Sequence, residues 1–179
     1  MQRPTLRTKR LVLRPFTLAD APRVQQLAGA REVALNTLTI PHPYPDGAAE
    51  EWIASHDAKF EQGQINFAID DGRLVGAIGL VTKREDDIAE IGYWIGVPYW
   101  GRGYASEAAE AVIRYGFEDQ RLNKIYAAHF TRNPASGRIL QKLGMHQEGT
   151  LRQHHRKWDE YVDSELYAIL KQDWIAGNR

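Results

Sequence analysis

Alternating apolar and polar positions predict a series of short β-strands along the chain. We expect strands near residues 10–15, 65–69, 74–81, 88–97, 124–130, 146–153 and 161–170. The Asp70-Asp71-Gly72 turn and the polar residues 83–87 are short connections, and connections of this length join antiparallel neighbours. The middle of the chain is therefore predicted to form an antiparallel meander.

Helical spacing and capping residues predict four helices. They are expected over about 17–30, from Asp46 past residue 60, over about 104–117, and from Asn133 to Gly144. Residues 36–45 contain three prolines in five positions and must form a loop. This order predicts an α/β (α+β) fold, with a mixed, mostly antiparallel central sheet of six to seven strands flanked by about four helices. The large apolar residues expected in its core are Trp52, Phe60, Phe67, Ile78, Phe117, Leu140 and Leu166.

Composition narrows the class of protein. The length of 179 residues fits a single domain over residues 1–179. The 23 basic and 23 acidic residues cancel, which argues against a partner such as nucleic acid, whose phosphates need a basic surface. No apolar run approaches the roughly 20 residues that span a bilayer, so we expect a cytoplasmic protein with no membrane partner. There is no cysteine, and no spacing of His, Asp and Glu predicts a metal site.

The most informative segment runs from Glu90 to Glu107. A predicted strand leads into a turn that contains Gly101 and Gly103, and the turn leads directly into a helix. The first amides of a helix have no intrahelical acceptor and lie at the positive end of its dipole. Glycine beside them allows a ligand oxygen to approach the main chain closely. This arrangement favours the binding of an anion, most often a phosphate.

Three interpretations of this turn stay open at this point. In the first, the glycines only permit a corner between strand and helix. In the second, they belong to a dinucleotide fingerprint, although Ser106 stands at its third position and a hairpin precedes the turn. In the third, Trp100-Gly-Arg-Gly-Tyr-Ala105 resembles the coenzyme A-binding motif Gln/Arg-x-x-Gly-x-Gly/Ala of the Gcn5-related N-acetyltransferase (GNAT) superfamily, with Trp100 in place of Gln or Arg.

Other segments share this resemblance. Asn133-Pro-Ala-Ser136 followed by Leu140-Gln-Lys-Leu-Gly-Met145 is similar to the second signature of the superfamily, with Met145 in place of the usual Phe. Residues 8–15, 40–44 and 148–152 resemble the subgroup that contains the ribosomal-protein N-terminal alanine and serine acetyltransferases. The resemblance covers about residues 5–171 and implies the GNAT fold.

The resemblance also implies a site for acetyl-CoA as co-substrate, without a metal. The pantetheine arm would pair with the main chain of Ile95 and Val97 and bond to Asn133, which is otherwise a plain helix N-cap. The pyrophosphate would lie on the amides of the glycine turn, near the Arg102 cation. The implied cofactor-binding residues are Ile95, Val97, Trp100, Gly101, Arg102, Gly103, Tyr104, Ala105, Ser106 and Asn133.

Acetyl transfer from a thioester requires a neutral amine, and most α-amines and lysines are protonated at neutral pH. Glu90 is the first candidate for the base, and His155 is the second; otherwise they are a solvated strand-end carboxylate and half of a surface pair with His154. The subgroup suggests Ser136 as proton donor to the thiolate. The residues expected at the acceptor pocket are His42, Tyr44 and Tyr93.

We therefore expect an N-acetyltransferase that moves an acetyl group from acetyl-CoA to a primary amine by direct attack in a ternary complex. The favoured acceptor is a protein N-terminal α-amine of the ribosomal-protein type. The alternatives are a small amine, such as a polyamine, an aminoglycoside or an amino acid, and a coenzyme A-binding sensor or assembly protein without transfer activity. The protein is expected to be a monomer or a homodimer.

Overall fold

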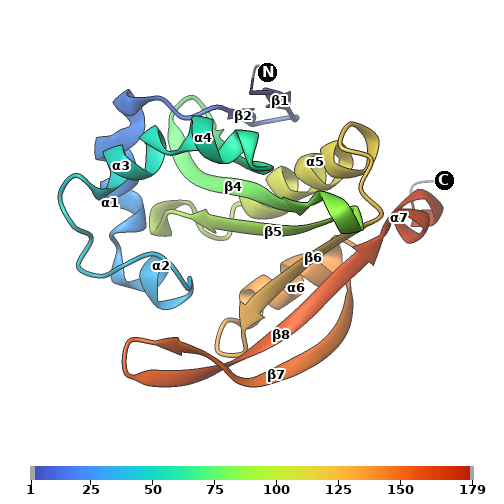
Figure 1. Ribbon diagram of the computed structural model, residues 1–179. Coiled ribbons are helices and arrows are strands. Elements are labelled where there is room, and N and C mark those ends of the chain that lie inside the picture. Colours follow the sequence, from blue (N-terminus) through green and yellow to red (C-terminus); the bar gives the residue numbers. More distant parts are fainter. Residues whose placement is uncertain (1–2, 178–179) are drawn as a thin grey trace.

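The computed structural model describes residues 3–177, and these residues are organised around one β-sheet (Figure 1). Within this part of the chain, eight strands lie in the order β1-β2-β3-β4-β5-β6-β8-β7. The strands are β1 (Leu6–Arg7), β2 (Val12–Arg14), β3 (Gln64–Asp70), β4 (Leu74–Lys83), β5 (Ile88–Ile95), β6 (Lys124–Phe130), β7 (His146–Lys157) and β8 (Glu160–Leu170). Neighbours are antiparallel except β5 and β6, which are parallel.

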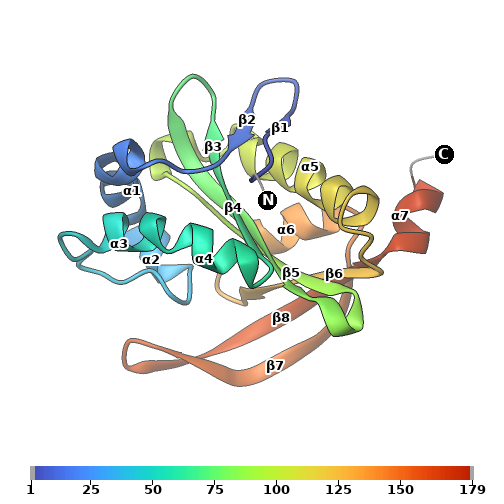
Figure 2. The ribbon, with the colours of Figure 1, turned by 45° about the horizontal axis from the view of Figure 1, so that its top comes forward.

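Helices cover both faces of the sheet, with α3 and α4 on one face and α5 and α6 on the other (Figure 2). The α-helices of the described part are α1 (Ala21–Ala28), α2 (Arg31–Leu35), α3 (Ala48–Ala54), α4 (His56–Glu61), α5 (Tyr104–Glu118), α6 (Pro134–Lys142) and α7 (Lys171–Gly177). Three single turns of 3₁₀-helix are η1 (Leu18–Asp20), η2 (Arg84–Asp86) and η3 (Val97–Tyr99). None of the helices in residues 3–177 is both long and apolar enough to cross a bilayer.

Two clusters of buried apolar side chains hold these layers together. The larger one joins the sheet to α5 and contains Ile91 and Val112. The smaller one joins the other face to α1 and α3 and contains Val24 and Ile53. Burial on both faces positions the central strands, because each side chain removed from water adds roughly 1.5–3 kcal/mol to folding.

The sheet opens between β5 and β6. These two parallel strands pair only at Ile88 with Lys124, Ala89 with Ile125 and Glu90 with Tyr126. Beyond Glu90 the strands separate, as Figure 1 shows, while β5 stays paired with β4 and β6 with β8. The facing edges of both strands therefore have main-chain groups available to a third, extended partner.

The predicted fold class is confirmed, and the structure has more elements than the expected six to seven strands and about four helices. A two-residue strand, β1, accounts for the additional strand. The helix predicted from Asp46 is divided at Ser55 into α3 and α4, and α2 and α7 were not predicted. Elements of two to seven residues contain too little of a helical or strand period to be recognised.

Some local predictions were wrong. The N-cap of α3 is Gly47, in the left-handed region at φ 79°, and not Asp46, whose carboxylate accepts a bond from Gln25 instead. Trp52, Phe60 and Leu166 are only half-buried, whereas the other predicted core residues are buried. Trp52 is only partly covered because it lines a cleft.

Candidate functional site

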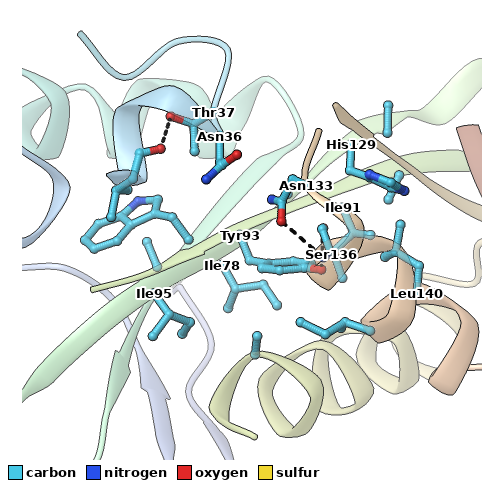
Figure 3. Close-up of a pocket in the computed structure, with 18 of the residues that line it drawn as sticks. Asn36, Thr37, Ile78, Ile91, Tyr93, Ile95, His129, Asn133, Ser136 and Leu140 are labelled. Atoms are coloured by element: carbon cyan, nitrogen blue, oxygen red, sulfur yellow. Dashed lines mark hydrogen bonds between the residues drawn. The ribbon is translucent and has the colours of Figure 1, made fainter. Parts of the chain in front are cut away.

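A cleft of about 920 Å³ opens where β5 and β6 separate. Strands β3 to β6, helices α5 and α6 and the loop at 36–40 contribute its lining, part of which is drawn in Figure 3. Most predicted site residues lie in this lining: Glu90, Tyr93, Ile95, Trp100, Gly101, Gly103, Tyr104, Ala105, Ser106, Asn133, Ser136 and His155. The others, His42, Tyr44, Val97 and Arg102, lie outside it. We call the part around residues 95–106 the turn end, and the part around Glu90, His155 and the loop at 36–40 the far end.

The turn end is a glycine corner that leads into α5. Gly101 and Gly103 have φ angles of 74° and 78°, in the left-handed region that favours glycine. Gly103 is the N-cap of α5 and has no side chain to bond the first amides of the helix. A Cβ atom added to Gly101 would meet nothing within 4 Å, so open space lies beside this main chain. The corner can therefore accept an anionic oxygen on its amides, as a phosphate requires.

A network from the N-terminal segment holds this corner in place. The Arg10 guanidinium donates to the Arg102 carbonyl at 3.0 Å and to the Glu107 carboxylate at 2.7 Å. Thr8 also donates to Glu107. Burial alone would raise the pKa of Glu107, but the bonds from Thr8 and Arg10 lower it below the usual value. Arg10 could not be identified from the sequence, because its partners lie more than 90 residues away.

Trp100 has a structural role in the same corner. Its indole Nε1 donates to the Ile95 carbonyl at 2.6 Å and so fixes the end of β5 against the turn. This bond uses one lone pair of a carbonyl that was expected to pair with pantetheine. Val97 lies in η3, and the Arg102 guanidinium packs on the Tyr99 ring, 5.3 Å from its centroid.

Three polar side chains meet in the middle of the cleft (Figure 3). The Tyr93 hydroxyl lies 2.9 Å from Ser136 Oγ, and either atom can donate. The Asn133 side chain caps α6 by accepting from the Ser136 amide at 3.4 Å. Burial raises the pKa of Tyr93, although its bond to Ser136 opposes this, so the phenol keeps its proton at neutral pH. No local pattern in the sequence links Tyr93 with Ser136, which stand 43 residues apart.

Glu90 and His155 both line the far end of the cleft. Glu90 is the last residue of β5 that pairs with β6, and its side chain is exposed. Burial lowers the pKa of His155, His154 lowers it further, and Glu90 opposes both effects. His155 is therefore neutral at physiological pH and can accept a proton.

Bare main chain lies beside Glu90. Gly79 on β4 pairs with Gly92 on β5, and Glu90 and Gly92 share one face of their strand. A Cβ added to Gly92 would meet nothing within 4 Å. Open space therefore lies on the carboxylate's face of the sheet at Gly92, which leaves room for a small group such as an amine, whereas a Cβ at Gly79 would meet Asn66 Oδ1 at 2.8 Å.

The loop that was expected to shape the acceptor pocket contributes other residues than the predicted ones. Asn36, Thr37 and the segment 38–40 line the cleft. His42 is exposed, with Nδ1 3.0 Å from the Gly29 carbonyl, and Tyr44 packs against the smaller core cluster. Proline-rich loops give no regular period, so the inward-facing residues could not be identified from the pattern.

The charges in the lining are few. Glu90 is the only carboxylate among the described residues of the lining, and Arg138 and Lys142 on α6 are its permanent cations. Within residues 3–177, no group of three or more His, Cys, Asp or Glu side chains is placed to hold a metal ion.

Comparisons with known proteins agree with this geometry. Residues 10–146 match the family described as acetyltransferase (GNAT) domain. The chain is 33% identical over 177 residues to the uncharacterized N-acetyltransferase p20 of Bacillus licheniformis, covering 96% of this chain and 99% of that protein. It is 29% identical over 141 residues to the ribosomal protein uS5-alanine N-acetyltransferase of Escherichia coli, covering 76% and 73% of the two chains.

Solved structures show the same fold. A GNAT-family acetyltransferase from Bacillus anthracis superposes with a TM-score of 0.84 at 26% identity, over 94% of this chain and 99% of that one. The spermidine N-acetyltransferase of Vibrio cholerae, solved with CoA and spermine, has a TM-score of 0.81 at 21% identity, over 93% and 98% of the chains, and shares the fold. The chain belongs to the GNAT acetyltransferase family and is an N-acetyltransferase.

Proposed function

We propose that this enzyme transfers the acetyl group of acetyl-CoA to the α-amine of a protein N-terminus, by direct attack in a ternary complex. The observation that carries the proposal is the open first turn of α5 behind Gly101 and Gly103, placed at the end of the separated strands. The chain has no cysteine, so no thiol is available to carry the acetyl group between two half-reactions.

The turn end fits the diphosphate of acetyl-CoA. Its left-handed glycines leave the helix amides uncovered, and a side chain at Gly101 would fill the space that a phosphate needs. The unpaired edge of β5 after Glu90 supplies main-chain groups for the amide-containing pantetheine arm. When bound, acetyl-CoA supplies an acetyl group activated as a thioester.

Glu90 and His155 are positioned to remove the proton of the incoming amine. Both line the far end, and the neutral imidazole of His155 can accept a proton directly or through water. Glu90 adds a negative charge that attracts the ammonium form of the acceptor.

Ser136 is positioned to return a proton. Its hydroxyl can donate to the leaving sulfur, and the Tyr93 hydroxyl, 2.9 Å away, can replace that proton. Because burial raises the pKa of Tyr93, this phenol is protonated at neutral pH and can donate its proton to Ser136. The pair thus supplies the acid for which the sequence offered only Ser136.

The charges of the lining favour a singly charged acceptor. A polyamine has several ammonium groups, and the described lining offers Glu90 alone to balance them, with Arg138 and Lys142 repelling further cations. An N-terminal peptide presents one amine followed by neutral amide groups. A small-molecule amine with a single charge remains the second candidate.

A mass-spectrometric screen tests the proposal. The wild-type enzyme and acetyl-CoA are incubated with peptides of different N-terminal residues and with spermidine, an aminoglycoside and free amino acids. We expect acetylation of peptide α-amines, and preferential acetylation of spermidine would contradict it.

Glu90→Gln tests the first of the two proposed bases in the same assay. Loss of a general base should lower kcat/KM for the peptide about 100-fold. Glu61→Gln, an exposed change on α4, is the matched control and should leave the rate unchanged. Equal rates for Glu90→Gln and wild type would remove Glu90 from the mechanism.

A further inference from the structure

Lys157, at the end of β7, is a buried lysine whose role the proposed chemistry leaves unexplained. The residue is 4% exposed. Its ammonium donates to the carbonyls of Leu38 at 3.2 Å and Ile40 at 2.7 Å. Among the described residues it has no carboxylate within ion-pair distance. Burying an ammonium that has only neutral carbonyls as partners costs desolvation free energy. We therefore expect these two bonds to have a role in the shape of the cleft.

Arg132, in the turn between β6 and α6, contacts the end of α2 beside this loop. Its Nη2 donates to the Leu35 carbonyl at 2.8 Å, while Nη1 lies 3.2 Å from the Glu160 carboxylate. Two cations from the second half of the chain thus bind three main-chain carbonyls of residues 35–40. We call this set of bonds the loop clamp.

The neighbouring Trp158 ring extends the contact. The Arg31 guanidinium lies 5.4 Å from its centroid, and the His42 ring lies 6.5 Å away. The tip of the β7–β8 hairpin is therefore attached to α2 and to the loop that follows it. These contacts explain why His42 lies outside the cleft.

The loop clamp joins two walls of the far end. Asn36, Thr37 and the segment 38–40 line the cleft on one side. His155 lines it from β7, two residues before Lys157. The distance between these walls, and so the space around Glu90, depends on the bonds that Lys157 makes.

We propose that Lys157, with Arg132, is a positioning residue for the acceptor: by holding the carbonyls of Leu38 and Ile40 it sets the wall that presents the amine to Glu90 and His155. This inference rests on the proposed function. It assigns the clamp to the acceptor and not to acetyl-CoA, because the carbonyls it holds belong to residues 35–40 and none belongs to the glycine corner at 95–106.

Lys157→Met tests the inference, because methionine keeps most of the unbranched chain and loses the ammonium with its three donors. We expect KM for the peptide acceptor to rise about tenfold, equivalent to about 1.4 kcal/mol, with Kd for acetyl-CoA within twofold of wild type. Lys157→Arg, which keeps the charge and donors, should recover part of the loss. Lys83→Met, an exposed change on β4, is the control.

A second variant covers the case in which Lys157→Met does not fold. Arg132→Met removes the bond to Leu35 together with the ion pair to Glu160, leaves both Lys157 bonds in place, and should raise the same KM by a smaller factor. Equal weakening of acetyl-CoA and acceptor binding, or an unchanged KM, in whichever variant folds would overturn the proposal.

Hydrogen exchange separates this inference from the proposed function. Amides of residues 35–40 should exchange faster in Lys157→Met, or in Arg132→Met, than in wild type, whatever the acceptor is. If wild type acetylates no peptide, the proposed acceptor is wrong, and faster exchange still supports the clamp. Unchanged exchange overturns the clamp even if the enzyme acetylates peptides.

Discussion

The two ends of the cleft are built in different ways. The turn end comes from one continuous stretch, residues 95–106, in which strand, glycine corner and helix start follow one another. The far end comes from the loop at 36–40, the middle of β5 and the end of β7, which only the folded chain brings together. A phosphate needs amides that a local turn can supply, whereas a specific amine needs walls on several sides.

The two ends of the cleft also differ in how far they depend on the acceptor. Any acetyl-CoA-dependent enzyme must hold the same diphosphate, whichever amine it acetylates. A local turn followed by a helix N-terminus is therefore compatible with many acceptors. In the function we propose, the far end selects the amine, and its walls are joined by distant contacts such as those of Lys157 with the loop. A change at one end should therefore alter one binding constant and leave the other.

The largest expected effect is at the turn end. Gly101→Val fills the open space beside the helix amides and should weaken acetyl-CoA binding about 1000-fold, or about 4 kcal/mol, through the loss of charge-assisted bonds. Gly47→Val is the matched control, since Gly47 has a similar φ of 79° and open space around it. Calorimetry with acetyl-CoA measures both, and similar affinities for the two variants would contradict a diphosphate site at Gly101.

The second effect concerns the support of the far end. His56 is buried behind Trp52, with ring centroids 4.4 Å apart, and neither of its nitrogens has a partner among the described residues. Burial, together with Arg3 and Lys59, lowers its pKa from 6.5 to about 4. Below pH 6.5 the unfolded chain binds a proton that the folded chain does not. The free energy of unfolding therefore decreases as the pH is lowered.

The predicted size of this fall is about 3 kcal/mol between pH 6.5 and pH 4, from the pKa difference at this one residue. His56→Leu removes the titrating group and should flatten the curve over that range by this amount. Denaturant unfolding of both proteins at several pH values measures it. Parallel curves would show that His56 is not kept neutral by the fold.

The smallest effect is expected where the two ends meet. Tyr93→Phe removes the partner of Ser136 and should lower kcat about tenfold, because Ser136 must then recover its proton from water. Binding of acetyl-CoA should not change. Tyr161→Phe, an exposed change on β8, serves as control in the same steady-state assay. An unaltered kcat for Tyr93→Phe would show that Tyr93 does not supply a proton to Ser136.

Local signals predicted much of the fold. The strand over 124–130 agrees with β6, and the Asn133-Pro134 pair marks the start of α6, where Asn133 caps the helix through its side chain. Alternation and turn residues are signals that lie within a few neighbouring positions, so they can be read directly from the sequence. Asp46 failed as an N-cap because its carboxylate bonds to Gln25 on another helix, which the local sequence does not reveal.

The candidate site divides in the same way. The glycine corner is formed by adjacent residues, so its turn and the start of α5 could be predicted from the sequence. The Arg10 contact with Glu107, the Tyr93 contact with Ser136 and the Lys157 contact with Ile40 join residues 97, 43 and 117 positions apart. No periodicity links such positions, and they become neighbours only when the sheet is assembled.

The opening between β5 and β6 has a consequence for solubility. Unpaired main-chain groups along an exposed sheet edge are a template for aggregation with other molecules. Here the unpaired lengths of two strands face each other inside one molecule, and each strand is protected on its other side by β4 or β8. The unpaired main-chain groups of β5 and β6 are thus kept inside one molecule, where another copy cannot add a strand to them.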